Sequence, residues 1–150
     1  MMLNLSELFQ KTRPLSVNKL EDVGDILQYL LPWVALLAVA LQGDAEAARR
    51  WLYAGSITVT LTLLGKFLFN FTPLGTRPNG GRDSFPSGHT SSAFMGAAFV
   101  HFHFGWPWAI LPYLLAALTG YSRIQANKHW LRDVIAGAVL AVVTGYFTVG

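Results

Sequence analysis

Histidine, arginine and lysine side chains gather in two polar stretches of an otherwise apolar sequence. Residues 72–90 read TPLGTRPNGGRDSFPSGHT, and residues 122–133 read SRIQANKHWLRD. Together they contain Arg77, Arg82, His89, Arg123, Lys128, His129 and Arg132. Guanidinium groups bind phosphoryl oxygens as planar forks, and imidazoles exchange protons near neutral pH. Because the two apolar stretches between them can fold back as a hairpin, we expect the loops to meet and form a phosphate site.

The residues Pro86-Ser87-Gly88-His89 come directly before an apolar stretch with the character of a helix. Ser87 is a suitable N-cap, and Gly88 lets the backbone approach a ligand closely. The unpaired N–H groups of a helix start, together with the helix dipole, attract anions. The sequence therefore predicts an anion-binding helix start at this point.

His129 and Asp133 lie four residues apart, which is the spacing of neighbours on one face of a helix. Asp133 can then accept a hydrogen bond from Nδ1–H of His129. This bond would fix the tautomer in which Nε2 carries the lone pair and is able to attack. We therefore expect a nucleophilic histidine that is oriented by a carboxylate.

Three blocks of the sequence, taken in order, resemble the motifs of the type 2 phosphatidic acid phosphatase (PAP2) family. They are Arg77-Pro78, then Pro86-Ser87-Gly88-His89, then Ser122-Arg123 followed by His129 and Asp133. The resemblance covers about residues 50–149. The first block departs from the family, which has a lysine where this chain has Asn70. The nearest lysine, Lys66, lies one turn deeper on the same helix face and either reaches the phosphate or only snorkels towards water.

The resemblance implies a role for each matched residue. His129 is the nucleophile that forms a phosphohistidine, Asp133 orients it, and His89 protonates the leaving oxygen and then activates water. The residues implied to hold the phosphoryl group are Arg77, Arg123, Ser87, Gly88 and Lys66. The two loops offer only Asp83 and Asp133 as carboxylates, too few for a magnesium or two-metal site. We therefore expect a reaction without a metal or cofactor.

Apolar helices must position these residues. Hydrophobic residues make up 53% of the chain and charged residues 13%, against about a quarter charged in soluble domains. Apolar stretches cover residues 26–41, 51–71, 91–104, 106–121 and 134–149. We predict an all-α integral-membrane bundle of about five transmembrane helices, with residues 25–150 as the catalytic domain. Residues 1–24 mix apolar and charged side chains and predict an amphipathic helix in the interface, broken near Pro14.

These features predict a metal-independent membrane lipid phosphatase. Candidate substrates are phosphatidylglycerol phosphate, undecaprenyl diphosphate, phosphatidic acid and the lipid A 1-phosphate. A lipid-to-lipid phosphotransferase and a non-catalytic lipid-binding protein are the alternatives. We expect no nucleic-acid partner, and the oligomeric state stays open. The resemblance favours a bacterial inner membrane with the site facing the periplasm, whereas the count of Lys and Arg alone favours the cytoplasm.

Overall fold

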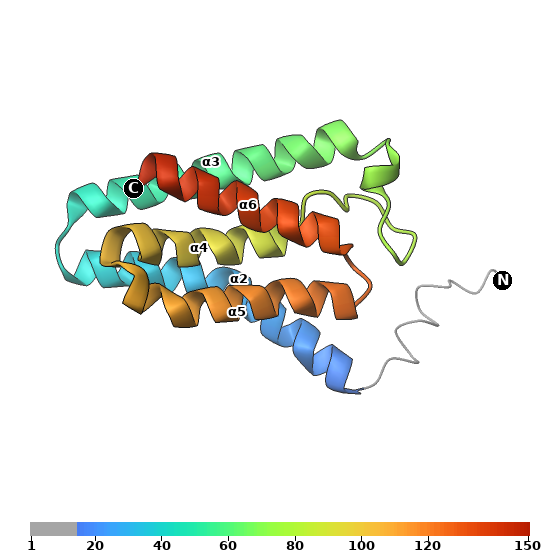
Figure 1. Ribbon diagram of the computed structural model, residues 1–150, viewed down its shortest axis with the longest axis horizontal. Coiled ribbons are helices and arrows are strands. Elements are labelled where there is room, and N and C mark those ends of the chain that lie inside the picture. The colour runs from blue at the N-terminus through green and yellow to red at the C-terminus, as the bar shows by residue number, and fades with distance from the viewer. Residues whose placement is uncertain (1–14) are drawn as a thin grey trace.

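Helices satisfy the backbone polar groups of an apolar chain from within, and they make up most of this structure. The computed structural model describes residues 15–150, and no strand occurs among them. The elements are α2 (Leu15–Leu41), α3 (Ala45–Phe69), the 3-10 turn η1 (Pro73–Gly75), α4 (Gly88–Phe104), α5 (Trp106–Gln125) and α6 (Leu131–Thr148). Figure 1 shows α3, α4, α5 and α6 running roughly along the long axis of the molecule, while α2 runs obliquely to it. The predicted all-α bundle is confirmed.

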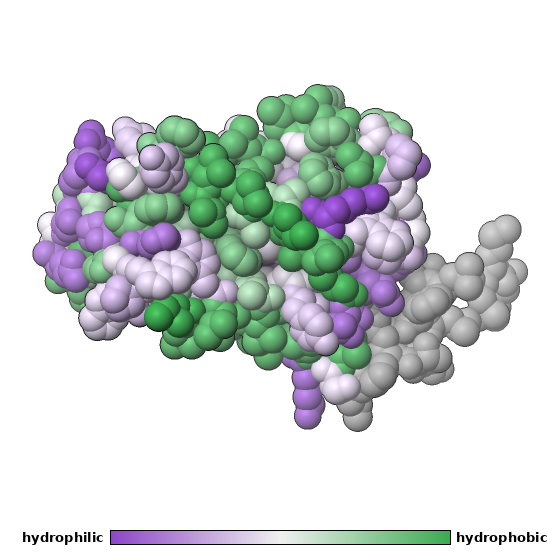
Figure 2. Space-filling model, viewed as in Figure 1, coloured by the Kyte–Doolittle hydropathy of each residue, from purple (hydrophilic) through white to green (hydrophobic). Residues whose placement is uncertain are grey.

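The lengths and compositions of three of the helices in residues 15–150 suit a lipid bilayer. Ser16–Leu41, Ala45–Phe69 and Leu131–Thr148 are long and apolar enough to cross a membrane. Large apolar side chains such as Leu37, Leu63 and Val139 are exposed on the outside of the bundle. Figure 2 shows apolar residues over the middle of the molecule and hydrophilic residues towards its two ends. The chain is therefore a helical bundle of the membrane type.

The helix α2 runs without a break from Leu15 to Leu41. Residues 15–24 of the predicted amphipathic segment are thus the first turns of this long helix, and no helix boundary separates residues 24 and 25. The rest of the predicted segment, with its break near Pro14, lies outside the described residues. The continuity matters for function because it places the first turns of α2 at the end of the bundle where α4 begins (Figure 1).

The central helix is α4, which packs against each of the other four. Its contact with α2 is unusually close at Gly96, where an added Cβ would lie 2.5 Å from the backbone N of Pro32. Pro32 has no N–H, so the C=O of Gln28 one turn earlier loses its helical donor. The hydroxyl of Ser92 donates to that oxygen instead, at 2.6 Å. The two helices therefore approach closely at Gly96, and the hydrogen bond from the Ser92 side chain holds them in one register.

We predict that Gly96→Ala destabilises the bundle, because the new methyl group must push α2 away from α4. Overpacking of this kind costs about 1–3 kcal/mol. The thermal unfolding midpoint of the purified protein in detergent should fall accordingly.

Gly55→Ala is the matched control, since it is also in a helix and its Cβ would meet only the mobile methyl of Met95, at 3.3 Å. An unfolding midpoint in Gly96→Ala equal to that of Gly55→Ala would show that the α2–α4 contact is loose.

Candidate active site

Residues from four helices and two loops line a pocket of about 320 Å³ at the end of the bundle where α4 begins. The lining consists of Glu21, Asp25, Lys66, Arg77, Gly88, His89, Arg123, Lys128 and His129. The two polar loops thus meet, as the sequence predicts. Two predicted site residues, Ser87 and Asp133, are fully buried and lie outside this lining.

Ser87 caps the helix start, which confirms one prediction from the sequence. Its Oγ accepts hydrogen bonds from the N–H of Thr90, at 3.4 Å, and from the Thr90 hydroxyl, at 2.9 Å. The N–H of Ser87 donates to the C=O of Asp133, at 3.0 Å. This bond connects the start of α4 to the start of α6, so it holds the second and third motif blocks next to each other.

His129 does not lie on a helix, and this corrects the predicted geometry. It sits in the turn before α6, which begins at Leu131. Its Nδ1 lies 3.6 Å from Oδ2 of Asp133, too far for a hydrogen bond. Among residues 15–150, that Nδ1 has no hydrogen-bond partner.

The carboxylate of Asp133 is instead engaged by the start of α6. Its Oδ2 accepts from the hydroxyl of Ser84 and from the N–H of Trp130, the latter at 2.9 Å. Asp133 is the third residue of the helix, where a carboxylate caps the free N–H groups. The sequence spacing points to the right pair of residues but misses this competing use of the carboxylate.

Burial and neighbouring cations set the charge of His129. Its side chain is 4% exposed. Burial lowers the pKa of His129 to about 3, helped by the positive charges of Lys66 and Arg77. The imidazole is therefore neutral at physiological pH and keeps a lone pair, as a nucleophile requires.

Lys66 reaches the pocket from one turn deeper in α3. Its Nζ donates to the C=O of Asp83, at 2.6 Å, and its Cε lies 3.7 Å from where a Cβ on Gly88 would be. Arg77 Nη2 approaches the same Asp83 oxygen, at 3.5 Å. Asn70, at the family's lysine position, binds the loop backbone through the N–H of Asp83, at 3.1 Å. Lys66 and Arg77 thus contact the same carbonyl oxygen, while the Asn70 side chain holds the loop backbone at Asp83.

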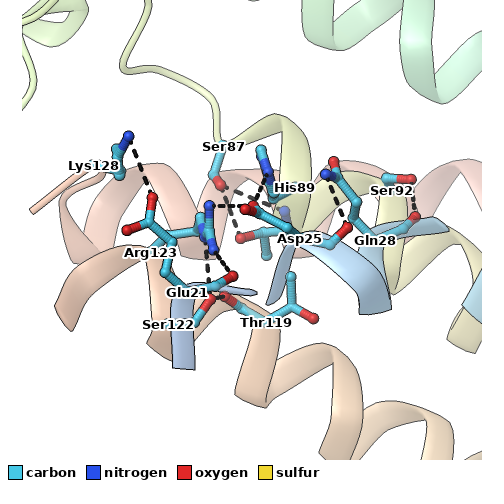
Figure 3. Close-up of polar contacts among 11 residues, drawn as sticks. Glu21, Asp25, Gln28, Ser87, His89, Ser92, Thr119, Ser122, Arg123 and Lys128 are labelled. Atoms are coloured by element: carbon cyan, nitrogen blue, oxygen red, sulfur yellow. Dashed lines mark hydrogen bonds and ion pairs between the residues drawn. The ribbon is translucent and has the colours of Figure 1, made fainter. Parts of the chain in front are cut away.

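Arg123 is buried, with a side chain that is 3% exposed. Its Nη1 lies 2.8 Å from Oδ1 of Asp25, and its Nη2 donates to the C=O of Glu21, at 2.6 Å. The same Oδ1 of Asp25 lies 2.9 Å from Nε2 of His89. Figure 3 shows Asp25 between the guanidinium of Arg123 and the imidazole of His89.

Asp25 and Glu21 are site residues that the sequence motifs do not predict. Both lie near the start of the first apolar stretch, four residues apart and so on one helix face. Paired carboxylates at the edge of a membrane span are a usable signal, because ionised groups there need partners. Lys128 completes the set, with Nζ 3.3 Å from Oε1 of Glu21.

Residues 15–150 contain no group of three or more His, Cys, Asp or Glu side chains placed to hold a metal ion. Four cations, Lys66, Arg77, Arg123 and Lys128, line the pocket instead. Fixed positive charge of this kind can bind and stabilise a phosphoryl group.

Known proteins resemble this chain in sequence. A lipid A 1-phosphatase from Porphyromonas gingivalis is 30% identical over 95% of this chain and 34% of its own length. A lipid A 4'-phosphatase from Helicobacter pylori is 30% identical, covering 81% of this chain and 65% of that protein. The undecaprenyl-diphosphatase BcrC of Bacillus subtilis is 31% identical, covering 74% and 62%. The chain thus spans between about a third and two-thirds of the length of these relatives.

A solved structure shares the fold. The crystal structure of Aquifex aeolicus LpxE superposes with a TM-score of 0.75 and 24% sequence identity, over 99% of this chain and 95% of the other. The sequence model of the PAP2 superfamily matches residues 8–150. This match covers both polar loops and all five helices, so the chain belongs to the PAP2 superfamily.

Proposed function

We propose that this chain is a membrane lipid phosphatase that hydrolyses a phosphate ester or diphosphate of a lipid, without a metal, through a phosphohistidine on His129. One observation carries the proposal: a neutral, buried imidazole borders a pocket lined by four cations. An enzyme that transfers a phosphoryl group needs positioning and charge stabilisation above all. The pocket provides both beside a nucleophile.

The first step is attack of His129 Nε2 on phosphorus, in line with the leaving oxygen. The P–N bond forms as the P–O bond to the lipid breaks, and His89 gives its proton to the departing oxygen. Arg77, Arg123 and Lys66 neutralise the phosphoryl oxygens, and the helix start at Gly88 adds backbone donors. Asp133 lies 3.6 Å from Nδ1 of His129 and stabilises the positive charge that the ring acquires.

The second step is hydrolysis of the phosphohistidine. His89, now neutral, takes a proton from water as the water oxygen attacks phosphorus. The P–N bond breaks, inorganic phosphate leaves and His129 is restored. Ser87, whose hydroxyl is occupied by Thr90, supports the helix start in both steps.

A lipid is the substrate class that the surroundings of the pocket favour. The pocket is large enough for the phosphate of a lipid headgroup. The exposed apolar side chains of Phe71 and Leu131 border its loops. The relatives carry the names of phosphatases of lipid A and of undecaprenyl diphosphate. These two lipids are therefore the first to test, with phosphatidylglycerol phosphate and phosphatidic acid next.

The proposed location is a bacterial inner membrane, with the pocket facing the periplasm. The bacterial lipid phosphatases among the relatives support a bacterial membrane protein, and the resemblance of the motifs to the family favours the periplasmic side. Because the chain contains no cysteine, an impermeant thiol reagent can test the orientation on intact cells. It should label Asn79→Cys and spare Gln42→Cys, and the reverse pattern would place the pocket in the cytoplasm.

We predict that His129→Ala abolishes phosphate release from these lipids. Loss of the nucleophile removes the covalent route, so kcat should fall by about 10³-fold or more. The measurement is inorganic phosphate released by purified protein in detergent micelles.

His101→Ala is the control, because His101 lies near the far end of α4, beside Tyr113. A second test concerns metals: the wild-type protein should keep its rate of phosphate release when EDTA removes divalent metal ions. Equal activity of His129→Ala and the wild type, or activity that needs added Mg²⁺, would contradict the mechanism.

Vanadate should inhibit competitively, because its five-coordinate form resembles the transition state. We expect Lys66→Met to weaken this inhibition by about 10-fold or more, since a charge-assisted contact is lost. Asn70→Ala should have a smaller effect, because its amide holds only the loop. The inhibition constants of the two variants test which residue replaces the family's lysine, and an unchanged constant in Lys66→Met would leave that residue without a role in binding.

A further inference from the structure

Asp25 shares one carboxylate oxygen between two groups of the site. Its Oδ1 lies 2.9 Å from Nε2 of His89 and 2.8 Å from Nη1 of Arg123 (Figure 3). Asp25 belongs to α2, 64 residues before His89 and outside the three motif blocks of the family. A carboxylate placed between an imidazole and a guanidinium can hold both in fixed orientations.

The packing of α2 fixes where this carboxylate stands. Next to Asp25, Gly24 faces α5 so closely that an added Cβ would lie 2.0 Å from Oγ of Ser122 and 2.9 Å from Nη2 of Arg123. On the other side, Ser92 of α4 donates to the backbone oxygen of Gln28, one turn beyond Asp25. The start of α2 is thus registered against both helices that carry its partners.

The charges around His89 explain what a carboxylate adds. A general acid must carry a proton, and protonated His89 adds positive charge to a pocket that already contains Lys66, Arg77, Arg123 and Lys128. His129 lines the same pocket as a neutral ring, and Glu21 on α2 is paired with Lys128. Asp25 is the carboxylate in contact with the imidazole, and its charge offsets part of the penalty that burial and Arg123 impose on the protonated form.

We propose that Asp25 is a positioning residue for the acid step: it accepts a hydrogen bond from Nε2–H of His89, orients the ring and helps it to hold the proton that Nδ1 gives to the leaving oxygen. This inference rests on the proposed function. No new bond forms at Asp25. When the proton leaves His89 the carboxylate stays ionised, and when water is deprotonated in the second step the proton returns to Nδ1.

Leaving groups of different basicity separate this role from a structural one. An alkoxide leaves poorly without a proton, so phosphatidic acid needs the acid. A nitrophenolate leaves readily unprotonated, so a nitrophenyl phosphate that carries an alkyl chain needs it little. The constant kcat/KM reports the steps up to departure of the first product, before water enters. Asp25 also contacts Arg123, but that guanidinium binds phosphate in both substrates, and its effect cancels in the ratio of the two constants.

The experiment measures kcat/KM for both substrates in the same micelles, for the wild type, Asp25→Asn and Asp22→Asn. We expect Asp25→Asn to lower kcat/KM for phosphatidic acid by about 100-fold, within the range of general acid catalysis. It should lower kcat/KM for the nitrophenyl ester by only about 10-fold. Asp25→Glu, which keeps the carboxylate, should recover part of the loss. Asp22→Asn is the matched control on the same helix, where Asp22 is exposed and outside the pocket.

An equal loss with both substrates would overturn the inference and give Asp25 a structural role. A rise in kcat/KM would also overturn it, because the carboxylate would then be a competitor for the phosphate position. In both cases a wild type that needs His129 leaves the proposed function standing. A wild type that hydrolyses neither these two esters nor the other three candidate lipids would overturn the proposed function and this inference together.

Discussion

Several positively charged side chains lie close together at one end of this apolar bundle. The carbonyl and carboxylate oxygens that contact them offset their mutual repulsion. Two unit charges 4 Å apart interact by about 4 kcal/mol at the effective dielectric of a protein surface. The pocket lining contains four such cations, Lys66, Arg77, Arg123 and Lys128. Lys66 and Arg77 both donate to the C=O of Asp83. Arg123 forms an ion pair with Asp25, and Lys128 forms one with Glu21. A phosphate that enters can replace the C=O of Asp83 as the acceptor of Lys66 and Arg77, so these cations are already gathered around the charge that the pocket is proposed to bind.

The same field determines the chemistry of the two histidines. Buried beside Lys66 and Arg77, His129 has a lowered pKa and stays neutral, which suits a nucleophile. His89 lies against the carboxylate of Asp25, which suits a group that must carry a proton. Two identical side chains in one small pocket thus differ in their direct contacts. His89 contacts a carboxylate, whereas Nδ1 of His129 has no hydrogen-bond partner among residues 15–150, and this difference suits an acid–nucleophile pair.

Much of the fold and of the site follows from local rules in the sequence. Apolar stretches predict the helices, the N-cap of Ser87 is confirmed, and the two polar loops meet in one pocket. The parts that do not follow depend on contacts between distant segments. Asp25 reaches the site because Gly24 lets α2 pack tightly on α5 and Gly96 lets α4 pack tightly on α2. The carboxylate of Asp133 is too far from His129 for a hydrogen bond, because it caps the start of α6 instead.

The most direct test of the proposed mechanism is to trap the phosphorylated intermediate. Wild-type protein would be mixed with a lipid labelled in its phosphate, quenched in alkali within the first turnover, digested and analysed by mass spectrometry. Alkali preserves a phosphohistidine. The mechanism predicts phosphate on the peptide that contains His129, at Nε2, and none in His129→Ala. Label on another residue, or turnover without any labelled peptide, would contradict it.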